Sequence, residues 1–158
     1  MSKQKSEVEI YLEYTRKLAL QIKKDDETLK KLKDNVMDIS AHIDGERVQS
    51  SHQNKKAEMI DSIIDLSRTI ESHLIEIKRS QAECLEMIYK VPNVTYQQVL
   101  SSYYVDCLIE TKKRRGITYI TKSWQDVAYE FGKTETWCIT QCAEAKKEFE
   151  KIYKEKYR

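Results

Sequence analysis

Residues 123–150 read SWQDVAYEFGKTETWCITQCAEAKKEFE, and this stretch predicts two helices separated by a turn at Gly132. Ser123 lies immediately before the first helix and Asp126 three residues later, the spacing of a capping-box variant. An alanine four residues before the glycine provides the small side chain that two closely crossing helices need, and glycine adopts the positive φ of the turn. Thr134 is placed to cap the second helix. The stretch therefore predicts a helix-turn-helix, a motif with which many proteins enter a groove of DNA.

The second predicted helix has two different faces at a step of 100° per residue. Its predicted inward stripe is Cys138, Cys142, Ala145, Phe149 and Ile152. Its opposite face is Thr136, Thr140, Ala143, Glu144 and Lys147. Acidic residues are unusual in such a helix, but a carboxylate can accept a hydrogen bond from cytosine N4, and a threonine methyl group can contact thymine. We interpret Glu135, Thr136 and Thr140 as candidate base contacts.

Cations around this motif are candidates for phosphate contacts, because phosphate neutralisation supplies most of the non-specific affinity for DNA. The predicted set is Arg114, Arg115, Lys122, Lys133 and Lys147. Residues 92–158 contain 12 Lys and Arg against 9 Asp and Glu, whereas residues 1–91 contain 16 against 17. The excess of cations therefore coincides with the motif. For the run KKRR at 112–115, an alternative is that its cations stabilise the C-terminus of a preceding helix.

The N-terminal part of the chain has the pattern of two long helices. Apolar residues recur at spacings of mainly four and three: Leu18, Ile22, Leu29, Leu32, Val36, Ile39 and Ile43. This seam predicts a helix over residues 7–43, about 55 Å long at 1.5 Å per residue. Residues 44–56, DGERVQSSHQNKK, are predicted to be a loop, after which the periodicity resumes at Met59 and stops before Pro92. Two such helices are expected to form an antiparallel hairpin.

The complete prediction is an all-α chain with two parts, a helical hairpin over residues 1–91 and a helix-turn-helix domain over 92–158. Residues 95–113 are predicted to be a helix that ends at Gly116, followed by a connector, ITYITK, for which a short extended segment is an alternative. Apolar residues outside the hairpin seam, among them Ile60, Ile64 and Leu85, need a cover. Self-association into a four-helix arrangement would cover them, and so would packing of the C-terminal part. We expect a homodimer.

The composition argues against several other classes of protein. The chain has no apolar run of membrane-spanning length and no apolar signal core at its start, so we expect a cytoplasmic protein with no membrane partner. Its four cysteines lack CxxC spacing, and its three histidines are isolated. We therefore expect reduced cysteines and no metal or cofactor. The sequence contains no glycine-rich phosphate loop and no nucleophile elbow, and we expect no enzymatic activity.

The order of these features resembles a known family over about residues 10–152. The most telling pieces are GERVQSS at 45–51, SWQDVA at 123–128 and TETW at 134–137. With the helical hairpin, they resemble small phage and prophage proteins whose C-terminal domain is similar to region 4 of sigma-70 factors, related to the ArpU-like and RinA-like late transcription regulators. The resemblance implies a regulator that binds double-stranded DNA near a promoter, with host RNA polymerase as a candidate second partner. It also implies that residues 134–140 begin the recognition helix and that Trp124 and Trp137 are packing residues.

Two other functions remain open at the level of sequence. The motif could have lost contact with DNA and serve as a protein-binding module of a mobile element that engages a host factor. The combination of a DNA-binding motif with an oligomerising hairpin also occurs in small terminase subunits, which form rings. The absence of arginine from the second helix of the motif favours the first alternative, and a particle of many subunits would favour the second.

Overall fold

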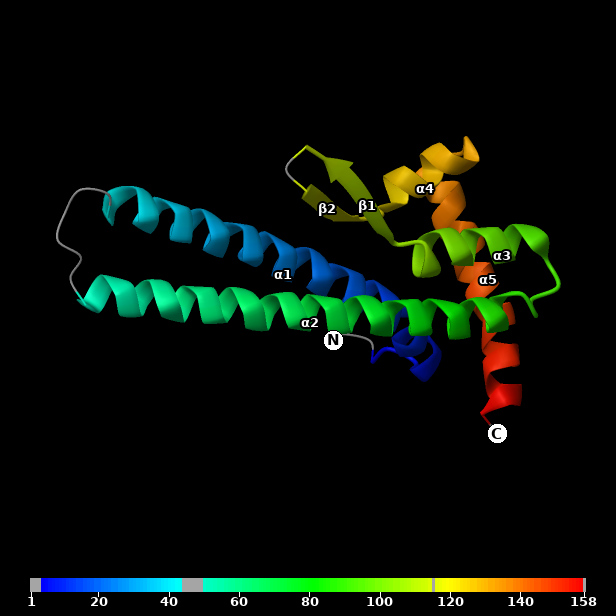
Figure 1. Ribbon diagram of the computed structural model, residues 1–158. Coiled ribbons are helices and arrows are strands. Elements are labelled where there is room, and N and C mark those ends of the chain that lie inside the picture. Colours follow the sequence, from blue (N-terminus) through cyan, green and yellow to red (C-terminus); the bar gives the residue numbers. More distant parts are fainter. Residues whose placement is uncertain (1–3, 44–49, 115, 158) are drawn as a thin grey trace.

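The computed structural model describes residues 4–43, 50–114 and 116–157, with side chains except at 40–43 and 50–53 (Figure 1). The described elements, in chain order, are α1 (Glu7–Ile43), α2 (Ser50–Ile88), α3 (Val94–Leu100), the π-helical turn η1 (Ser101–Val105), β1 (Leu108–Lys113), β2 (Gly116–Thr121), α4 (Trp124–Phe131) and α5 (Glu135–Lys156). The chain is therefore mostly helical, as predicted, but it also contains two strands.

The long helices α1 and α2 lie side by side and run in opposite directions (Figure 1). This helical hairpin confirms the arrangement inferred from the apolar seam, and α1 has the predicted bounds. The predicted loop is too long, because α2 already begins at Ser50. Residues 50–56 contain no glycine or proline, so nothing stops the helix from extending back from its apolar part. The remainder of the predicted loop, residues 44–49, lies outside the described residues.

The seam of the hairpin holds one hydrophobic cluster, with Ala19, Ile22 and Leu29 of α1 against Ile70 and Ile77 of α2. A polar pair lies within the same seam, where Asp25 Oδ2 is 3.7 Å from His73 Nδ1. Along the outer side of α2, Ile60 and Ile64 are 41% and 44% exposed. The seam therefore buries one stripe of each helix and leaves a second apolar stripe of α2 at the surface.

A second and larger cluster lies where the open end of the hairpin meets the C-terminal elements. Every helix except α4 contributes buried residues to it: Val8, Leu12, Cys84, Met87, Ile88, Val99, Leu100, Cys142, Ala145 and Phe149. The phenyl ring of Phe149, for example, is fully buried and stacks at 6.2 Å from the ring of Tyr11. The hairpin and the C-terminal elements thus share one hydrophobic core, which holds α5 against the two long helices.

The helix expected over residues 95–113 is wrong beyond Val105, because residues 108–121 form an antiparallel two-stranded ribbon. Its register runs from Leu108 opposite Thr121 to Lys113 opposite Gly116. The sequence ITYIT of β2 is rich in β-branched and aromatic residues, which favour strands. Gly116, rather than ending a helix, starts β2 with a φ of 119°. The predicted connector is therefore the second strand of this ribbon.

No described helix is both long enough and apolar enough to cross a membrane.

Candidate nucleic-acid interface

The local structure predicted around Gly132 is confirmed. The hydroxyl of Ser123 accepts a hydrogen bond from the backbone N–H of Asp126 at 3.3 Å, and Asp126 Oδ2 accepts one from the backbone N–H of Ser123 at 2.8 Å. These bonds to the ionised carboxylate lower the pKa of Asp126. Gly132 has the left-handed φ of 62°, and Thr134 Oγ1 accepts a hydrogen bond from the backbone N–H of Trp137 at 3.1 Å. Two capped helices, α4 and α5, are therefore joined by a tight glycine turn.

The two faces of α5 are also arranged as predicted. Cys138, Cys142, Ala145 and Phe149 are buried. Cys138 packs against Val127 and Ala128 of α4, so the small residue lies at the contact between the two helices. The opposite face is open to solvent at Thr136, Thr140, Ala143, Glu144 and Lys147. The three candidate base contacts, Glu135, Thr136 and Thr140, are therefore all exposed in the first turns of α5.

One residue of this surface was not identified from the sequence. Ile139 is 46% exposed, although it is a large apolar residue in the middle of a packed helix. It follows Thr136 by three residues, and residues at this spacing are neighbours on a helix surface. The sequence contains a signal for this residue, because Ile139 is apolar but lies outside the inward stripe of the helix. It adds an apolar side chain to an otherwise polar surface.

Glu135 and Glu144, the two acidic residues in the first half of α5, have different environments. Glu144 Oε2 accepts a hydrogen bond from the hydroxyl of Tyr96 in α3 at 2.8 Å. This bond raises the pKa of Tyr96, because it stabilises the protonated phenol beside a carboxylate. Glu135 lies in the first turn of α5, where a negative charge is favourable for the helix. Each acid therefore has a structural role, which accounts for part of the unusual charge of this helix.

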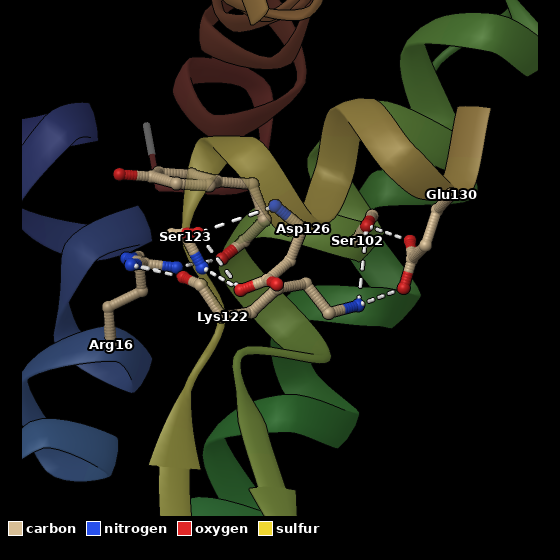
Figure 2. A network of polar contacts seen from close by, with 7 residues as sticks. Arg16, Ser102, Lys122, Ser123, Asp126 and Glu130 are labelled. Atoms are coloured by element: carbon tan, nitrogen blue, oxygen red, sulfur yellow. Dashed lines mark hydrogen bonds and ion pairs between the residues drawn. The ribbon is translucent and has the colours of Figure 1, made fainter. Parts of the chain in front are cut away.

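Lys122 is not available for the phosphate contact predicted for it. Its side chain is 8% exposed, and its ammonium lies 2.7 Å from Glu130 Oε1 and 3.4 Å from Ser102 Oγ (Figure 2). The hydroxyl of Ser102 in turn donates to Glu130 Oε2 at 2.5 Å. A buried ammonium that is paired in this way holds the fold together. The prediction is corrected on this physical ground.

The ion pair also changes the ionisation of its acidic partner. Partial burial opposes the charged form of Glu130, but the hydrogen bonds from Lys122 and Ser102 and the lysine charge outweigh it. The pKa of Glu130 therefore lies below its usual value. The carboxylate is charged at neutral pH and holds the lysine in place.

Arg16 of α1 holds the other side of the junction between β2 and α4, in which Lys122 lies. One terminal nitrogen of its guanidinium donates to the carbonyl of Tyr103 at 2.7 Å, and the other donates to the carbonyl of Lys122 at 2.8 Å. The guanidinium carbon lies 3.8 Å from the centre of the Tyr103 ring, on which the ring of Trp124 also stacks at 3.8 Å. Arg16 was not identified from the sequence, because its partners are 87 and 106 residues away. Trp124 packs here, in agreement with the role that the resemblance implies.

The other predicted phosphate contacts are at the surface but not all in one place. Lys133 and Lys147 are exposed beside α5, and the ammonium of Lys133 lies 5.5 Å from the centre of the Trp137 ring. Arg114 is exposed at the far end of the ribbon. Arg115 lies outside the described residues. Lys133 and Lys147 therefore lie at α5, whereas Arg114 lies away from it on the ribbon.

The four cysteines, Cys84, Cys107, Cys138 and Cys142, are free thiols, and all four are buried. Burial raises the pKa of Cys84 to about 12 and raises that of the other three above the ordinary value. Such thiols are weak nucleophiles at neutral pH. Within the described residues, no three His, Cys, Asp or Glu side chains come together as a metal site would require.

Comparison of the chain with models of protein families, with curated proteins and with solved structures gives no match in any of the three.

Replacing Glu130 by glutamine is expected to destabilise the fold. The variant leaves the buried ammonium of Lys122 without its counter-charge, which costs roughly 1–3 kcal/mol of unfolding free energy at pH 7. Because the pKa of Glu130 is lowered by folding, its contribution is complete above its unfolded pKa of about 4.3 and is lost as the pH falls through the lower folded value. Urea denaturation at pH 7 and pH 3 should show the difference between wild type and variant shrinking in acid.

The matched control is Glu148→Gln, which removes a carboxylate from the exposed pair with Lys151. Its effect should stay within about 0.5 kcal/mol. Equal stability of Glu130→Gln and wild type at pH 7 would show that the ion pair does not hold the junction.

Replacing Arg16 by lysine is expected to loosen the junction while keeping the charge. An ammonium cannot donate to both carbonyls and stack on Tyr103 as a planar guanidinium does, so a loss of about 1–3 kcal/mol is expected. Hydrogen exchange followed by mass spectrometry should show faster exchange in residues 103–123. The exposed neighbour Lys17, changed to alanine, serves as control and should leave both measurements unchanged. Unaltered exchange in Arg16→Lys would show that the hydrogen bonds of Arg16 to the carbonyls of Tyr103 and Lys122 do not hold this junction.

Proposed function

We propose that the protein is a sequence-specific DNA-binding regulator of transcription, in which α4, the Gly132 turn and α5 form a helix-turn-helix that places α5 in the major groove. The observation that carries this proposal is the open face of α5. Its candidate base contacts are exposed and lie in the turns that follow the capped Gly132 turn, whereas the opposite face is buried in the core. In DNA-bound helix-turn-helix proteins, the N-terminal residues of the second helix contact the base edges.

Each exposed residue of this half-helix suits one kind of contact. The methyl groups of Thr136 and Thr140 and the side chain of Ile139 can contact thymine methyl groups, and the threonine hydroxyls can bond to base edges. Glu135 can accept a hydrogen bond from cytosine N4. We assign phosphate contacts beside the groove to Lys133 and Lys147, which are both exposed. These residues favour a target that contains thymine and cytosine.

The role in transcription rests on the resemblance to the sigma-70 region 4-like phage regulators. It supports a site near a promoter and a contact with host RNA polymerase. The contact with polymerase would use a surface other than the open face of α5, since that face would be covered by DNA.

One observation favours the alternative function of a protein-binding module. Tyr129 on α4 is 90% exposed, and Tyr89 and Val94 at the end of α2 and the start of α3 are 63% and 62% exposed. Exposed large aromatic residues are enriched in protein interfaces. In this reading, α4 and α3 engage a host factor and α5 reads no DNA.

The first test of DNA readout is selection from a random duplex pool at near-physiological salt, followed by sequencing of the retained DNA. Wild type is expected to enrich a short motif, and the double variant Thr136→Ala, Thr140→Ala is expected to lose it. The matched control changes Thr28 and Thr69 to alanine, since both are exposed helical threonines far from α5. This control should enrich the same motif as wild type.

The outcomes separate the two functions. If the Thr136→Ala, Thr140→Ala variant enriches the same motif as wild type, then Thr136 and Thr140 of α5 do not read the bases. The absence of any enriched sequence would contradict the DNA-binding function and favour the protein-binding module.

We also propose that the chain is a homodimer, with a second apolar stripe of α2 at the interface. Ile60, Ile64 and Ile75 are 41%, 44% and 73% exposed along this stripe, whereas Leu85 is half-buried. A dimer would also bind one DNA molecule with two helix-turn-helix units, each of which is only weakly cationic.

Light scattering is expected to give twice the mass of one chain. The variant Ile60→Glu, Ile64→Glu should give a single chain with unchanged helix content, because the charges cannot be buried in the interface. The control Ile120→Glu alters an isoleucine of similar exposure on the ribbon and should remain dimeric. A monomer at high concentration would overturn the dimer, and a particle of eight or more chains would favour the terminase-like alternative.

A further inference from the structure

The tip of the ribbon carries a concentrated positive charge. Lys112, Lys113 and Arg114 are consecutive and all exposed, and they belong to the longest run of cations in the sequence. None of the ion pairs found among the described residues involves any of the three. Three neighbouring cations without counter-charges repel one another, and an anionic partner would relieve this repulsion.

The ribbon is held in place along its length. Leu108 and Tyr119, on one face of it, pack against the cluster of the helical hairpin. From α1, the ammonium of Lys30 donates to the carbonyl of Ile117 at 3.1 Å and to the hydroxyl of Thr118 at 3.3 Å. These contacts fix the part of β2 next to the tip, so the tip has a defined position relative to the rest of the molecule.

The base of the ribbon is joined directly to the proposed reading unit. A single residue, Lys122, separates β2 from the N-cap of α4, and its backbone N–H donates to the carbonyl of Cys107 at 2.7 Å. The contacts of Arg16 and Glu130 described above hold the same point. In Figure 1 the ribbon, α4 and the first turns of α5 lie on the same side of the helical hairpin, and the tip points away from α4.

The exposed part of α5 supplies little attraction for DNA by itself. Between residues 135 and 147 it contains Glu135 and Glu144 against Lys146 and Lys147, and the ammonium of Lys146 lies 3.9 Å from Glu9. Since affinity for DNA depends on the neutralisation of phosphates, a protein that reads bases with such a helix needs cations elsewhere. Within the described part of the chain, no other three consecutive residues are exposed cations.

We propose that the tip of the ribbon is a second DNA contact, in which Lys112, Lys113 and Arg114 bind backbone phosphates beside the minor groove that flanks the site of α5. This inference rests on the proposed function and extends it. A strand of six residues is about 20 Å long at 3.3 Å per residue. Half a turn of B-DNA is about 17 Å, so the tip can reach phosphates that α5 cannot. The α5 helix reads the bases, and the ribbon supplies affinity and extends the footprint to one side.

The experiment is hydroxyl-radical footprinting on a duplex of about 40 base pairs that carries the sequence enriched by wild type at its centre. Wild type is expected to protect a central region and a separate region about half a helical turn away. The variant Lys112→Ala, Lys113→Ala, Arg114→Ala should lose only the separate region. Its slope of log affinity against log salt should be less steep by about 2 to 3, since roughly 0.9 is lost for each phosphate contact.

Two variants control for charge and for folding. Lys112→Arg, Lys113→Arg, Arg114→Lys keeps the cations and should keep both protected regions. Lys151→Ala, Lys154→Ala, Lys156→Ala removes the same charge from exposed positions at the other end of α5, and it should also keep both regions. Circular dichroism should give the same melting temperature for the ribbon variant and wild type, because the three side chains are exposed.

The outcomes distinguish this inference from the proposed function. Loss of the flanking protection alone, with the central region intact, supports the ribbon contact. An unchanged footprint and salt slope in the ribbon variant would overturn the ribbon contact and leave readout by α5 standing. If wild type protects no DNA and enriches no sequence, both the proposed function and the ribbon contact fail.

Discussion

The guanidinium of Arg16 makes the contact on which the geometry of the candidate interface depends. It joins α1 to the residues that precede and follow the ribbon, because its two hydrogen bonds end on the carbonyls of Tyr103 and Lys122. A planar fork of donors can satisfy both carbonyls at once, and its face still stacks on the Tyr103 ring. The base of the ribbon and the start of α4 are therefore fixed to a long helix, and the position of α5 follows from them.

On the other side of this junction, the buried ammonium of Lys122 pairs with Glu130 at the end of α4. A buried ion pair is weak evidence for stability, since desolvation opposes the attraction between the charges. Its geometry is specific, however, because Ser102 bonds to the same carboxylate. The pair and the Arg16 clamp together hold α4 at both ends. Lys122, which the sequence suggested as a phosphate contact, instead holds in place the helices that would bind DNA.

The parts of the structure that could be predicted from the sequence are those set by local rules. The bounds of α1 followed from an apolar period, and the caps at Ser123 and Thr134 followed from the hydrogen-bonding needs of helix ends. The pairing of the two strands was missed because Leu108 continues the helical period of Val99 and Tyr103. The strands are also stabilised by packing on α1 that no local pattern reveals. The partners of Arg16 lie far away in the sequence, so the junction could not be inferred either.

The charge of α5 poses the question of how a helix with as many acids as bases between residues 135 and 147 could serve a DNA-binding protein. A strongly cationic reading helix binds every sequence through phosphates, and this lowers the ratio of specific to non-specific affinity. In the DNA complex that we propose, a nearly neutral helix such as α5 would discriminate through base edges and would contribute little to that background. Affinity must then come from another element, and the ribbon keeps its cations on a support that is rigidly joined to α4. Separation of the two tasks onto two elements makes the acids of α5 compatible with recognition of DNA.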